Sequence, residues 1–176
     1  MASDEAKPQF LMVNPWLNIV LLNPEIPNNT GNIGRTCAAT GCRLHLVHPL
    51  GFDLTEKARR RAGLDYWPLV DCVEHANMDA YLHDTQPKRL WLLTTHATRP
   101  IWDAPLQAGD HFLFGKETAG VPPEIHELVT DRWGQEARLT LPMVSDPRAR
   151  SLNLATAVCG AVYEAMRQVQ PDLTST

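Results

Sequence analysis

A strand-to-helix junction near the start of the chain decides the fold: the apolar run Leu17-Asn18-Ile19-Val20-Leu21-Leu22 leads, through a short Pro-containing linker, into Asn28-Asn29-Thr30-Gly31-Asn32-Ile33-Gly34-Arg35. The run predicts a buried β-strand, and the apolar spacing after it predicts a helix over residues 30–40 that stops at Gly41. Open α/β sheets bind ligands at such junctions, because free backbone amides converge where a helix begins. The stretch therefore predicts an α/β fold with a binding site at this junction.

Arg35 is the most informative side chain of this stretch. The expected helix start places it in the early turns, where the helix dipole disfavours a cation, so an anionic partner or a chemical role is indicated. The alternative is a glycine-rich turn with a helix cap, since Asn and Gly are favoured in such turns anyway. The residues alone leave both interpretations open.

Along the rest of the chain, short apolar runs alternate with helical patterns. We expect strands over residues 43–47, 89–94, 111–114 and 137–141, and helices over residues 55–62, 78–83, 122–129 and 151–168. This alternation predicts one α/β domain with a mainly parallel sheet. We place that domain at residues 17–170, between an N-terminal extension over residues 1–16 and a C-terminal tail over residues 171–176.

Composition limits the classes of protein to consider. The chain has 176 residues and a net charge of −4, so a polyanionic partner would need a local basic patch. Its four cysteines form no C-x-x-C pair, which argues against zinc and, without a signal peptide, against disulfides. Apolar runs of about six residues are far shorter than the roughly 20 that a membrane span needs. We therefore expect a cytoplasmic protein without metal or membrane contact.

The C-terminal helix is predicted to be apolar on two faces. Its stripes are Leu152, Ala155, Cys159, Val162 and Met166 on one side, and Leu154, Val158, Ala161 and Ala165 on the other. A helix that is apolar nearly all round must be buried on both sides. The second side then faces a subunit partner or, alternatively, the inside of a central core.

A second candidate segment runs from Phe112 to Pro122 and contains Gly115-Lys116-Glu117-Thr118-Ala119-Gly120. Gly115 lacks a side chain, so a flat ligand could approach the backbone closely there. The Glu117 carboxylate could accept hydrogen bonds from an amine or a hydroxyl. The alternative is a plain connector between a strand and a helix.

A third candidate segment runs from Leu141 to Asn153, again from a strand into a helix start. Ser151 is expected to cap the last helix. Asn153 would then lie two residues inside the helix, where asparagine is a mediocre helix former, and this indicates a hydrogen-bonding role. The alternative is that the segment only caps the helix through Ser151.

The order and combination of the three segments resemble the three motifs of the SPOUT methyltransferases. The matching residues are Asn29 and Arg35, Gly115-Lys116-Glu117 with Gly120, and Leu141-Pro142-Met143 with Ser151-Leu152-Asn153-Leu154. Within this superfamily the chain resembles the tRNA 2′-O-methyltransferases of the TrmL/YibK type. Further similar stretches are Pro24-Glu25-Ile26-Pro27, Arg43-Leu44-His45, residues 60–66 and Leu93-Thr94-Thr95, so the similarity runs from about residue 17 to about residue 166.

The resemblance implies a fold and partners that periodicity alone does not predict. It implies a parallel α/β fold whose C-terminal part forms a deep trefoil knot, although knots are nearly absent from proteins. It implies a homodimer formed through the C-terminal helix. It also implies S-adenosylmethionine as the methyl donor, S-adenosylhomocysteine as a product, and no metal.

The activity that the resemblance implies is methylation of the ribose 2′-hydroxyl at the wobble nucleotide, position 34, of leucine tRNAs. The target would be cytidine or carboxymethylaminomethyluridine, recognised through the anticodon stem-loop. Alternatives are a related 2′-O-methyltransferase that acts at another tRNA or rRNA position, or a knotted RNA-binding protein without catalysis.

The resemblance also implies roles for individual residues. The cofactor pocket would be lined by Leu93, Gly115, Leu141, Met143 and Ser151. The catalytic residues around the reacting centre would be Arg35, Asn29, Glu117 and Asn153, with Ser151 beside them. RNA would be bound by Arg35, Arg60 and Arg61, although a charge run such as residues 57–61 can equally be a solvated helix face.

The segment between Asp146 and Ser151 departs from the family pattern. It is about two residues longer here than the usual family sequence. The loop that covers the cofactor therefore has a different shape, and either Arg148 or Arg150 could replace the family arginine.

Arg35 presents a chemical difficulty, because the family assigns activation of the hydroxyl to its motif-one arginine. Arginine keeps its proton in proteins almost without exception, so it is a poor base. It could lose its proton in a special site, or stay charged, hold an RNA phosphate and stabilise the developing alkoxide. We favour the second possibility, with Asn29 and Asn153 holding the reactants in line.

Overall fold

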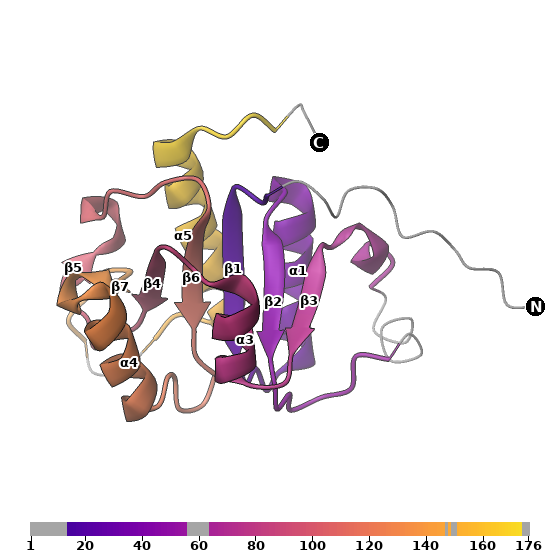
Figure 1. The fold of residues 1–176 in the computed structure, drawn as a ribbon, viewed down its shortest axis with the longest axis horizontal. Coiled ribbons are helices and arrows are strands. Elements are labelled where there is room, and N and C mark those ends of the chain that lie inside the picture. Colours follow the sequence, from indigo (N-terminus) through magenta and orange to yellow (C-terminus); the bar gives the residue numbers. More distant parts are fainter. Residues whose placement is uncertain (1–13, 56–63, 147, 149–150, 174–176) are drawn as a thin grey trace, which may run out of the picture.

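The computed structural model describes residues 14–55, 64–146, 148 and 151–173, which form a parallel sheet with helices on both faces (Figure 1). The described strands form a seven-stranded sheet in the order β3-β2-β1-β6-β4-β7-β5, and all neighbours are parallel. The strands are β1 (Leu17–Leu22), β2 (Arg43–Val47), β3 (Cys72–His75), β4 (Leu90–Leu93), β5 (Arg99–Pro100), β6 (Asp110–Phe114) and β7 (Arg138–Thr140). The predicted α/β class with a parallel sheet is confirmed.

The helices form two layers, with α1 and α5 behind the sheet in Figure 1 and with α3 and α4 toward the viewer. The α-helices are α1 (Pro27–Thr40), α3 (Met78–Thr85), α4 (Pro123–Trp133) and α5 (Leu154–Val169), and the short 3₁₀ turns are η2 (Trp67–Leu69), η3 (Ile101–Asp103) and η4 (Gln135–Ala137). Because helices cover both faces, the central strands are buried on both sides.

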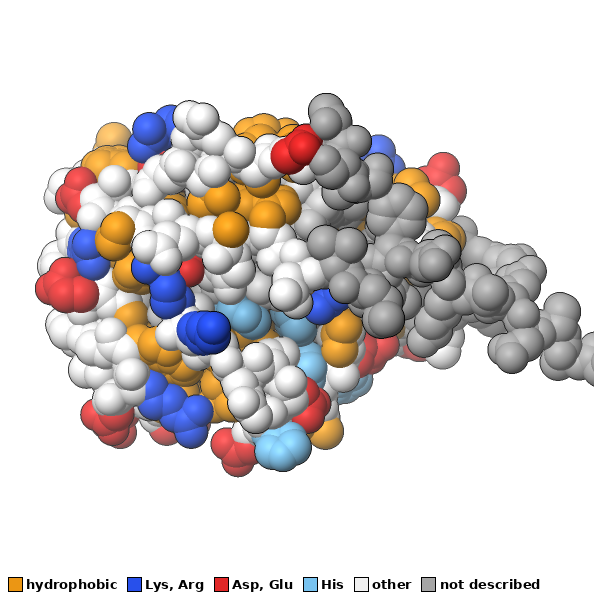
Figure 2. Space-filling model, turned by 45° about the horizontal axis from the view of Figure 1, so that its top comes forward, with side chains coloured by type: hydrophobic (Ala, Val, Ile, Leu, Met, Phe, Trp, Pro, Cys, Tyr) orange, Lys and Arg blue, Asp and Glu red, His pale blue; other side chains and the backbone are white. Residues whose placement is uncertain are grey.

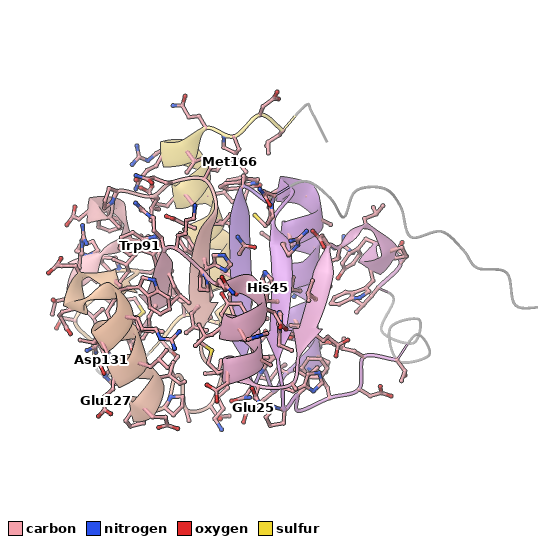
Figure 3. All side chains as sticks on the ribbon, in the orientation of Figure 1. Glu25, His45, Trp91, Glu127, Asp131 and Met166 are labelled. Carbon is pink, nitrogen blue, oxygen red and sulfur yellow. The ribbon has the colours of Figure 1, made fainter. Side chains whose placement is uncertain are left out.

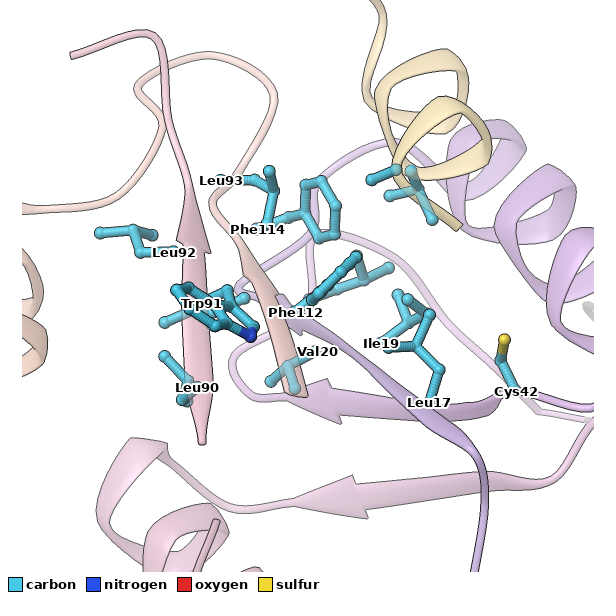
Figure 4. Close-up of a cluster of buried hydrophobic side chains, with 14 of the residues drawn as sticks. Leu17, Ile19, Val20, Cys42, Leu90, Trp91, Leu92, Leu93, Phe112 and Phe114 are labelled. Carbon is cyan, nitrogen blue, oxygen red and sulfur yellow. The ribbon is translucent and has the colours of Figure 1, made fainter. Parts of the chain in front are cut away.

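The core is centred on β1, whose six residues are all buried. Side chains alternate between the two faces of a strand, so one set packs toward α1 and α5. Figure 4 shows Leu17, Ile19 and Phe112 in this set, and Ile19 and Phe112 are register partners on β1 and β6. The continuous apolar run thus forms a fully buried central strand, as the sequence predicts.

Helix α1 begins at Pro27, three residues before the predicted start, although it ends as predicted at Gly41, which has a φ of 68°. Pro27 is the first helical residue, where its missing N–H has no intrahelical partner to lose. The N-cap is Ile26, whose side chain cannot accept a hydrogen bond. Pro27 is therefore a start signal, but the sequence carries no capping side chain for this helix.

Arg35 consequently lies in the middle of α1, as its ninth residue of 14, and is exposed. Arg35 therefore does not lie in an early turn, and the prediction that the helix dipole disfavours its charge is wrong. The alternative of a glycine-rich turn is also wrong, because residues 28–34 are helical.

The start of α5 also differs from the prediction, since the N-cap is Asn153 and not Ser151. The Asn153 side chain accepts hydrogen bonds from the backbone N–H groups of Ala155 (2.9 Å) and Thr156 (3.3 Å). Asn and Ser are about equally good caps, so residue type alone could not decide between them. Ser151 is exposed and lies before the helix.

The other predicted elements match observed ones to within a few residues at each end, and two strands were not predicted. Strand β3 lies at one edge of the sheet and buries only His75 among its four residues, while β5 has two residues. Such short edge strands give almost no apolar signal. The helix predicted over residues 55–62 lies, apart from Thr55, outside the described residues.

The two chain ends and the knot are only partly covered by the described residues. Residues 1–13 and 174–176 of the expected extension and tail lie outside them, whereas the Trp16 indole donates a 2.6 Å hydrogen bond to the Thr40 carbonyl. The knot stays a prediction, because residues 147, 149 and 150 in the C-terminal part also lie outside. Within the described ranges, no helix has the length and apolar character for a membrane crossing.

Helix α5 buries one of its two apolar stripes in the described chain. Val158, Ala161 and Ala165 are completely buried beside α1. In the other stripe only Val162 is buried, Leu152 is 44% exposed, and the neighbouring Tyr163 is 55% exposed. This pattern fits a helix with one face in the core, and the homodimer stays a prediction.

A buried polar cluster lies between the sheet and α3. His45 Nδ1 is 3.0 Å from His75 Nε2, His45 Nε2 is 3.1 Å from Asn18 Oδ1, and the Tyr81 hydroxyl is 2.7 Å from His111 Nδ1. Burial lowers the pKa of His45 to about 3, and the neighbouring histidines add to this effect. Burial also lowers the pKa of His111 to about 4, with a smaller contribution from the positive charge of an arginine. Figure 2 shows histidine side chains gathered in one region of this face.

Acid should therefore destabilise the fold through His45 and His111, which stay neutral when folded. The unfolded chain binds protons at these groups below about pH 6.5, so their contribution to stability is complete above that pH and is lost as the pH falls toward about 4. The loss is up to about 1.4 kcal/mol per pH unit for each histidine. Urea unfolding between about pH 7 and about pH 5 measures it. His111→Gln should remove the contribution of one histidine to the pH dependence of the free energy of unfolding. The same pH dependence in the variant and the wild type would contradict this account.

Candidate functional site

The candidate site lies at the carboxyl ends of the strands, at the point where the strand order reverses. From β1 the chain continues to β2 and β3 on one side, and it later returns to place β6 on the other side of β1. The segments that follow β1 and β6 therefore meet at one edge, which is where open parallel sheets bind ligands. Glu25, in the segment after β1, lies at this edge in Figure 3.

A cleft of about 550 Å³ opens at this edge, a size typical of small-molecule sites. Its walls come from the segments after β1, β4, β6 and β7 and from the start of α5. All five residues expected in the cofactor pocket line it, namely Leu93, Gly115, Leu141, Met143 and Ser151. Three of the four residues expected at the reacting centre also line it, namely Asn29, Glu117 and Asn153.

A chain of hydrogen bonds joins the three sequence segments inside this cleft. Asn29 Nδ2 donates to Glu117 Oε1 over 3.0 Å, and Asn153 Nδ2 donates to Asn29 Oδ1 over 2.9 Å. Glu117 also accepts from the backbone N–H groups of Glu25 (2.8 Å) and Ile26 (3.2 Å). Its carboxylate therefore caps α1, which has no side-chain cap of its own, and a negative charge there suits the helix dipole.

Chemistry at the two ends of this chain fixes the orientation of both amides. An ionised carboxylate has no proton to donate, so the Glu117 carboxylate can act only as an acceptor. Asn29 must therefore present its NH₂ group to Glu117 and its side-chain oxygen to Asn153. The Asn153 oxygen is occupied by two N–H groups of α5, so its NH₂ group must face Asn29. Each amide then keeps a second N–H that has no partner among the described residues.

Position 115 must be a glycine, because the backbone of the following residues packs against it. A Cβ atom at this position would lie 2.2 Å from the Gly120 carbonyl carbon and 2.4 Å from the Val121 nitrogen, closer than any real contact. The cause is a tight hairpin in which Lys116 and Gly120 exchange backbone hydrogen bonds of 3.2 and 2.9 Å. We expected the glycine to admit a flat ligand, but the returning backbone already fills the space that a side chain would need.

The hairpin is also held from the other side by Glu25, a residue to which the sequence analysis gave no role. Glu25 Oε2 accepts from the Thr118 hydroxyl over 2.6 Å, and Lys116 Nζ lies 3.5 Å from Glu25 Oε1. The Thr118 hydrogen bond, supported by the Lys116 charge, lowers the pKa of the Glu25 carboxyl. The two segments are thus joined by reciprocal hydrogen bonds. The carboxylate after β1 accepts from donors in the segment after β6, and the carboxylate after β6 accepts from donors in the segment after β1.

Arg35 is not among the residues that line the cleft. It lies six residues beyond Asn29, which is about 9 Å farther along the helix and about 120° around its axis. Its guanidinium carbon is 4.3 Å from the centre of the Tyr66 ring. Within one chain, Arg35 therefore lies outside the cleft that contains the amide pair, Asn29 and Asn153.

The remaining predicted arginines are only partly described. Arg148 forms a bidentate pair with Asp146 at 3.0 and 2.7 Å, so in this structure its charge is taken up by that carboxylate. Arg60, Arg61 and Arg150 lie outside the described residues.

The cleft contains three further residues that follow β4, namely Thr94, Thr95 and His96. Thr94 and Thr95 belong to a stretch that resembles the family but were given no role, and His96 was not singled out. Their position directly after an apolar strand was the available signal, although the strand's place beside β6 was not known. Among the described residues, no three His, Cys, Asp or Glu side chains are grouped so that they could hold a metal ion.

Comparison with known proteins finds relatives that match most of this chain. Residues 16–163 match the SpoU rRNA Methylase family. A tRNA (cytidine(34)-2′-O)-methyltransferase of Saccharophagus degradans is 50% identical over 152 residues, which cover 86% of this chain and 95% of the relative. The tRNA (cytidine(34)-2′-O)-methyltransferase of Escherichia coli K12 is 46% identical over 87% of this chain and 94% of its own length.

A solved structure described as giving insights into the 2-OH methylation of C/U34 on tRNA superposes with a TM-score of 0.76 at 41% identity, covering 93% of this chain and all of its own. The family match spans most of the chain, and the two relatives share about half of their aligned residues with it. The chain therefore belongs to the SpoU rRNA Methylase family.

Proposed function

We propose that this protein transfers a methyl group from S-adenosylmethionine to the ribose 2′-hydroxyl of nucleotide 34 in leucine tRNAs, on cytidine or carboxymethylaminomethyluridine. The observation that carries the proposal is the hydrogen-bonded chain of Glu117, Asn29 and Asn153 at the cleft. The C34 methyltransferase names of the relatives support the chemistry and the position. The leucine isoacceptors and the modified uridine rest on the family resemblance.

The residues of the cleft fit S-adenosylmethionine. Leu93, Leu141 and Met143 offer apolar surface to a nucleoside, while the hairpin after Gly115 is fixed in shape by its own backbone. The volume of about 550 Å³ suits a ligand of this size. When bound, this cofactor supplies an electrophilic methyl group, and S-adenosylhomocysteine is left after transfer.

The amide pair would hold the acceptor oxygen. The second N–H groups of Asn29 and Asn153 have no acceptor among the described residues at the cleft, and their orientation is fixed by Glu117 and by α5. Preorganised donors of this kind stabilise negative charge that develops on an oxygen without further rearrangement. Alignment of two reactants can lower a barrier by about 7–11 kcal/mol, more than one general base usually supplies.

Arg35 would bind an RNA phosphate in its charged form. Its position on the exposed face of α1, outside the cleft, supports a role in holding the RNA rather than in taking the proton. The hydroxyl proton would then leave to water or to a phosphate. Arg60 and Arg61 would extend this RNA contact toward the anticodon stem-loop, and the enzyme would act in the cytoplasm.

A homodimer through α5 is part of the proposal. The half-exposed stripe of α5 and the exposed Leu152 and Tyr163 support a second protomer on that side. Gly160 supports it as well, because a Cβ atom there would meet no atom within 4 Å in the described chain and the helix surface is therefore open to close approach.

The experiment that tests the function uses the full chain, S-adenosylmethionine with a labelled methyl group, and total tRNA. We expect label on the ribose of nucleotide 34 in leucine isoacceptors, located by nuclease mapping. Label at another tRNA position, or on rRNA only, would assign the protein to a related methyltransferase. Cofactor binding without transfer to any RNA would contradict the catalytic role.

Gly115→Ala should weaken cofactor binding by at least about tenfold, because the added methyl group forces the hairpin out of shape. Calorimetry with S-adenosylhomocysteine measures the affinity, and circular dichroism checks the fold. Ala119→Gly is the matched control, since it removes a methyl group from an exposed position of the same hairpin. Equal affinities for Gly115→Ala and the wild type would show that the hairpin does not shape the site.

Arg35→Lys should reduce turnover on tRNA by roughly tenfold or more while leaving cofactor affinity unchanged, because lysine keeps the charge but cannot bind a phosphate with two parallel N–H groups. Arg35→Ala should lose more. Steady-state rates at saturating cofactor give the comparison. Wild-type turnover in both variants would exclude this role of Arg35.

A further inference from the structure

Tyr66 and Arg35 form a contact that the proposed mechanism does not explain. The guanidinium carbon of Arg35 lies 4.3 Å from the centre of the Tyr66 ring. Arg35 is exposed and has no hydrogen bond or ion pair with another described residue. The ring is therefore its identified partner in the described part of the chain, and a cation above an aromatic face is held by the ring's negative π surface.

Two glycines of α1 allow Tyr66 to reach this place. A Cβ atom at Gly34 would lie 2.7 Å from Trp67 Cζ3, and one at Gly31 would lie 3.0 Å from Leu64 Cδ2. Gly31 and Gly34 are three residues apart and share one face of the helix. Residues 64–67 pack directly against that face, which brings the Tyr66 ring beside Arg35, four residues beyond Gly31.

The Tyr66 ring is fixed independently of Arg35. Its hydroxyl donates a 2.7 Å hydrogen bond to the Gly31 carbonyl, and the next residue, Trp67, is buried with 6% of its surface exposed. An exposed arginine in solution samples many rotamers and loses that freedom when it binds. A ring anchored at both its edge and its backbone offers the guanidinium one preferred place before RNA arrives.

We propose that Tyr66 is a positioning residue for Arg35, a role that rests on the proposed function of this site. The ring occupies one face of the guanidinium, and the N–H donors at the guanidinium edge stay open to a phosphate. Gly31 and Gly34 are part of the same device, because they admit the segment that carries the ring. The ligand that Tyr66 prepares for is the RNA phosphate, not the cofactor.

A double-mutant cycle tests this role. Tyr66→Leu removes the ring, Tyr66→Phe keeps it and loses only the hydroxyl, and each is made with Arg35 and with Arg35→Ala. With Arg35 present, we expect Tyr66→Leu to lower kcat/KM for tRNA roughly three- to tenfold, with S-adenosylhomocysteine affinity unchanged. Tyr66→Phe should lose less, because it keeps the ring and loses only the hydroxyl bond to Gly31. In the Arg35→Ala background, Tyr66→Leu should have no further effect, because a positioning residue acts through its partner.

Other results of the cycle would overturn the proposal. An equal loss for Tyr66→Leu in both backgrounds would mean that the ring contacts RNA directly, for example by stacking on a base. An equal loss for Tyr66→Phe and Tyr66→Leu would assign the effect to the hydroxyl and not to the ring face. No loss in any background would leave Tyr66 without a part in the reaction.

A second measurement does not depend on methyl transfer. The ring current of Tyr66 should shift the Arg35 Hδ resonances upfield in the NMR spectrum of the free protein, and Tyr66→Leu should abolish the shift while Tyr66→Phe keeps it. Unshifted Arg35 resonances in the wild type would overturn the proposal. An inactive wild-type protein with shifted resonances would instead contradict the proposed function and leave the Arg35–Tyr66 contact established.

Discussion

The hydrogen bonds that the Glu117 carboxylate accepts at the start of α1 are the interaction on which the rest of the site depends. It accepts the N–H groups of Glu25 and Ile26 and one N–H of Asn29, so it joins the hairpin after β6 to the start of α1. This arrangement fixes the amide of Asn29, which in turn fixes Asn153 and the start of α5. One half-buried carboxylate thereby sets the relative positions of three segments that approach from different strands.

Three glycines near the site allow close packing between parts of the chain. Gly115 makes room for its own hairpin, and Gly31 and Gly34 make room for residues 64–67. In each case an added Cβ atom would lie 3.0 Å or less from another residue of the chain. The glycine pattern that first indicated a ligand site thus reports how tightly the walls of that site are assembled.

Much of the architecture could be predicted from the sequence, because β1, β2 and the long helices have clear apolar patterns. The motif residues Asn29, Glu117 and Asn153 could also be singled out. The start of α1 could not, since its cap is supplied by Glu117 from 91 residues away. Because the start of α1 was predicted three residues too late, Arg35 was placed too early in the helix. Its contact with an aromatic ring could not be predicted, because no local sequence pattern links residues 35 and 66. Ser151 and Asn153 are caps of equal quality, so only the bond to Asn29 decides between them.

The hydrogen bonds that build the cleft join residues 88 and 124 positions apart in the sequence. Contacts of such long range form late, because the intervening chain must first be ordered. Asn153 follows β7, the last described strand in the chain, so during synthesis it leaves the ribosome after the whole described sheet. A nascent chain can therefore hold the whole described sheet and still lack the side of the cleft that Asn153 and the start of α5 supply.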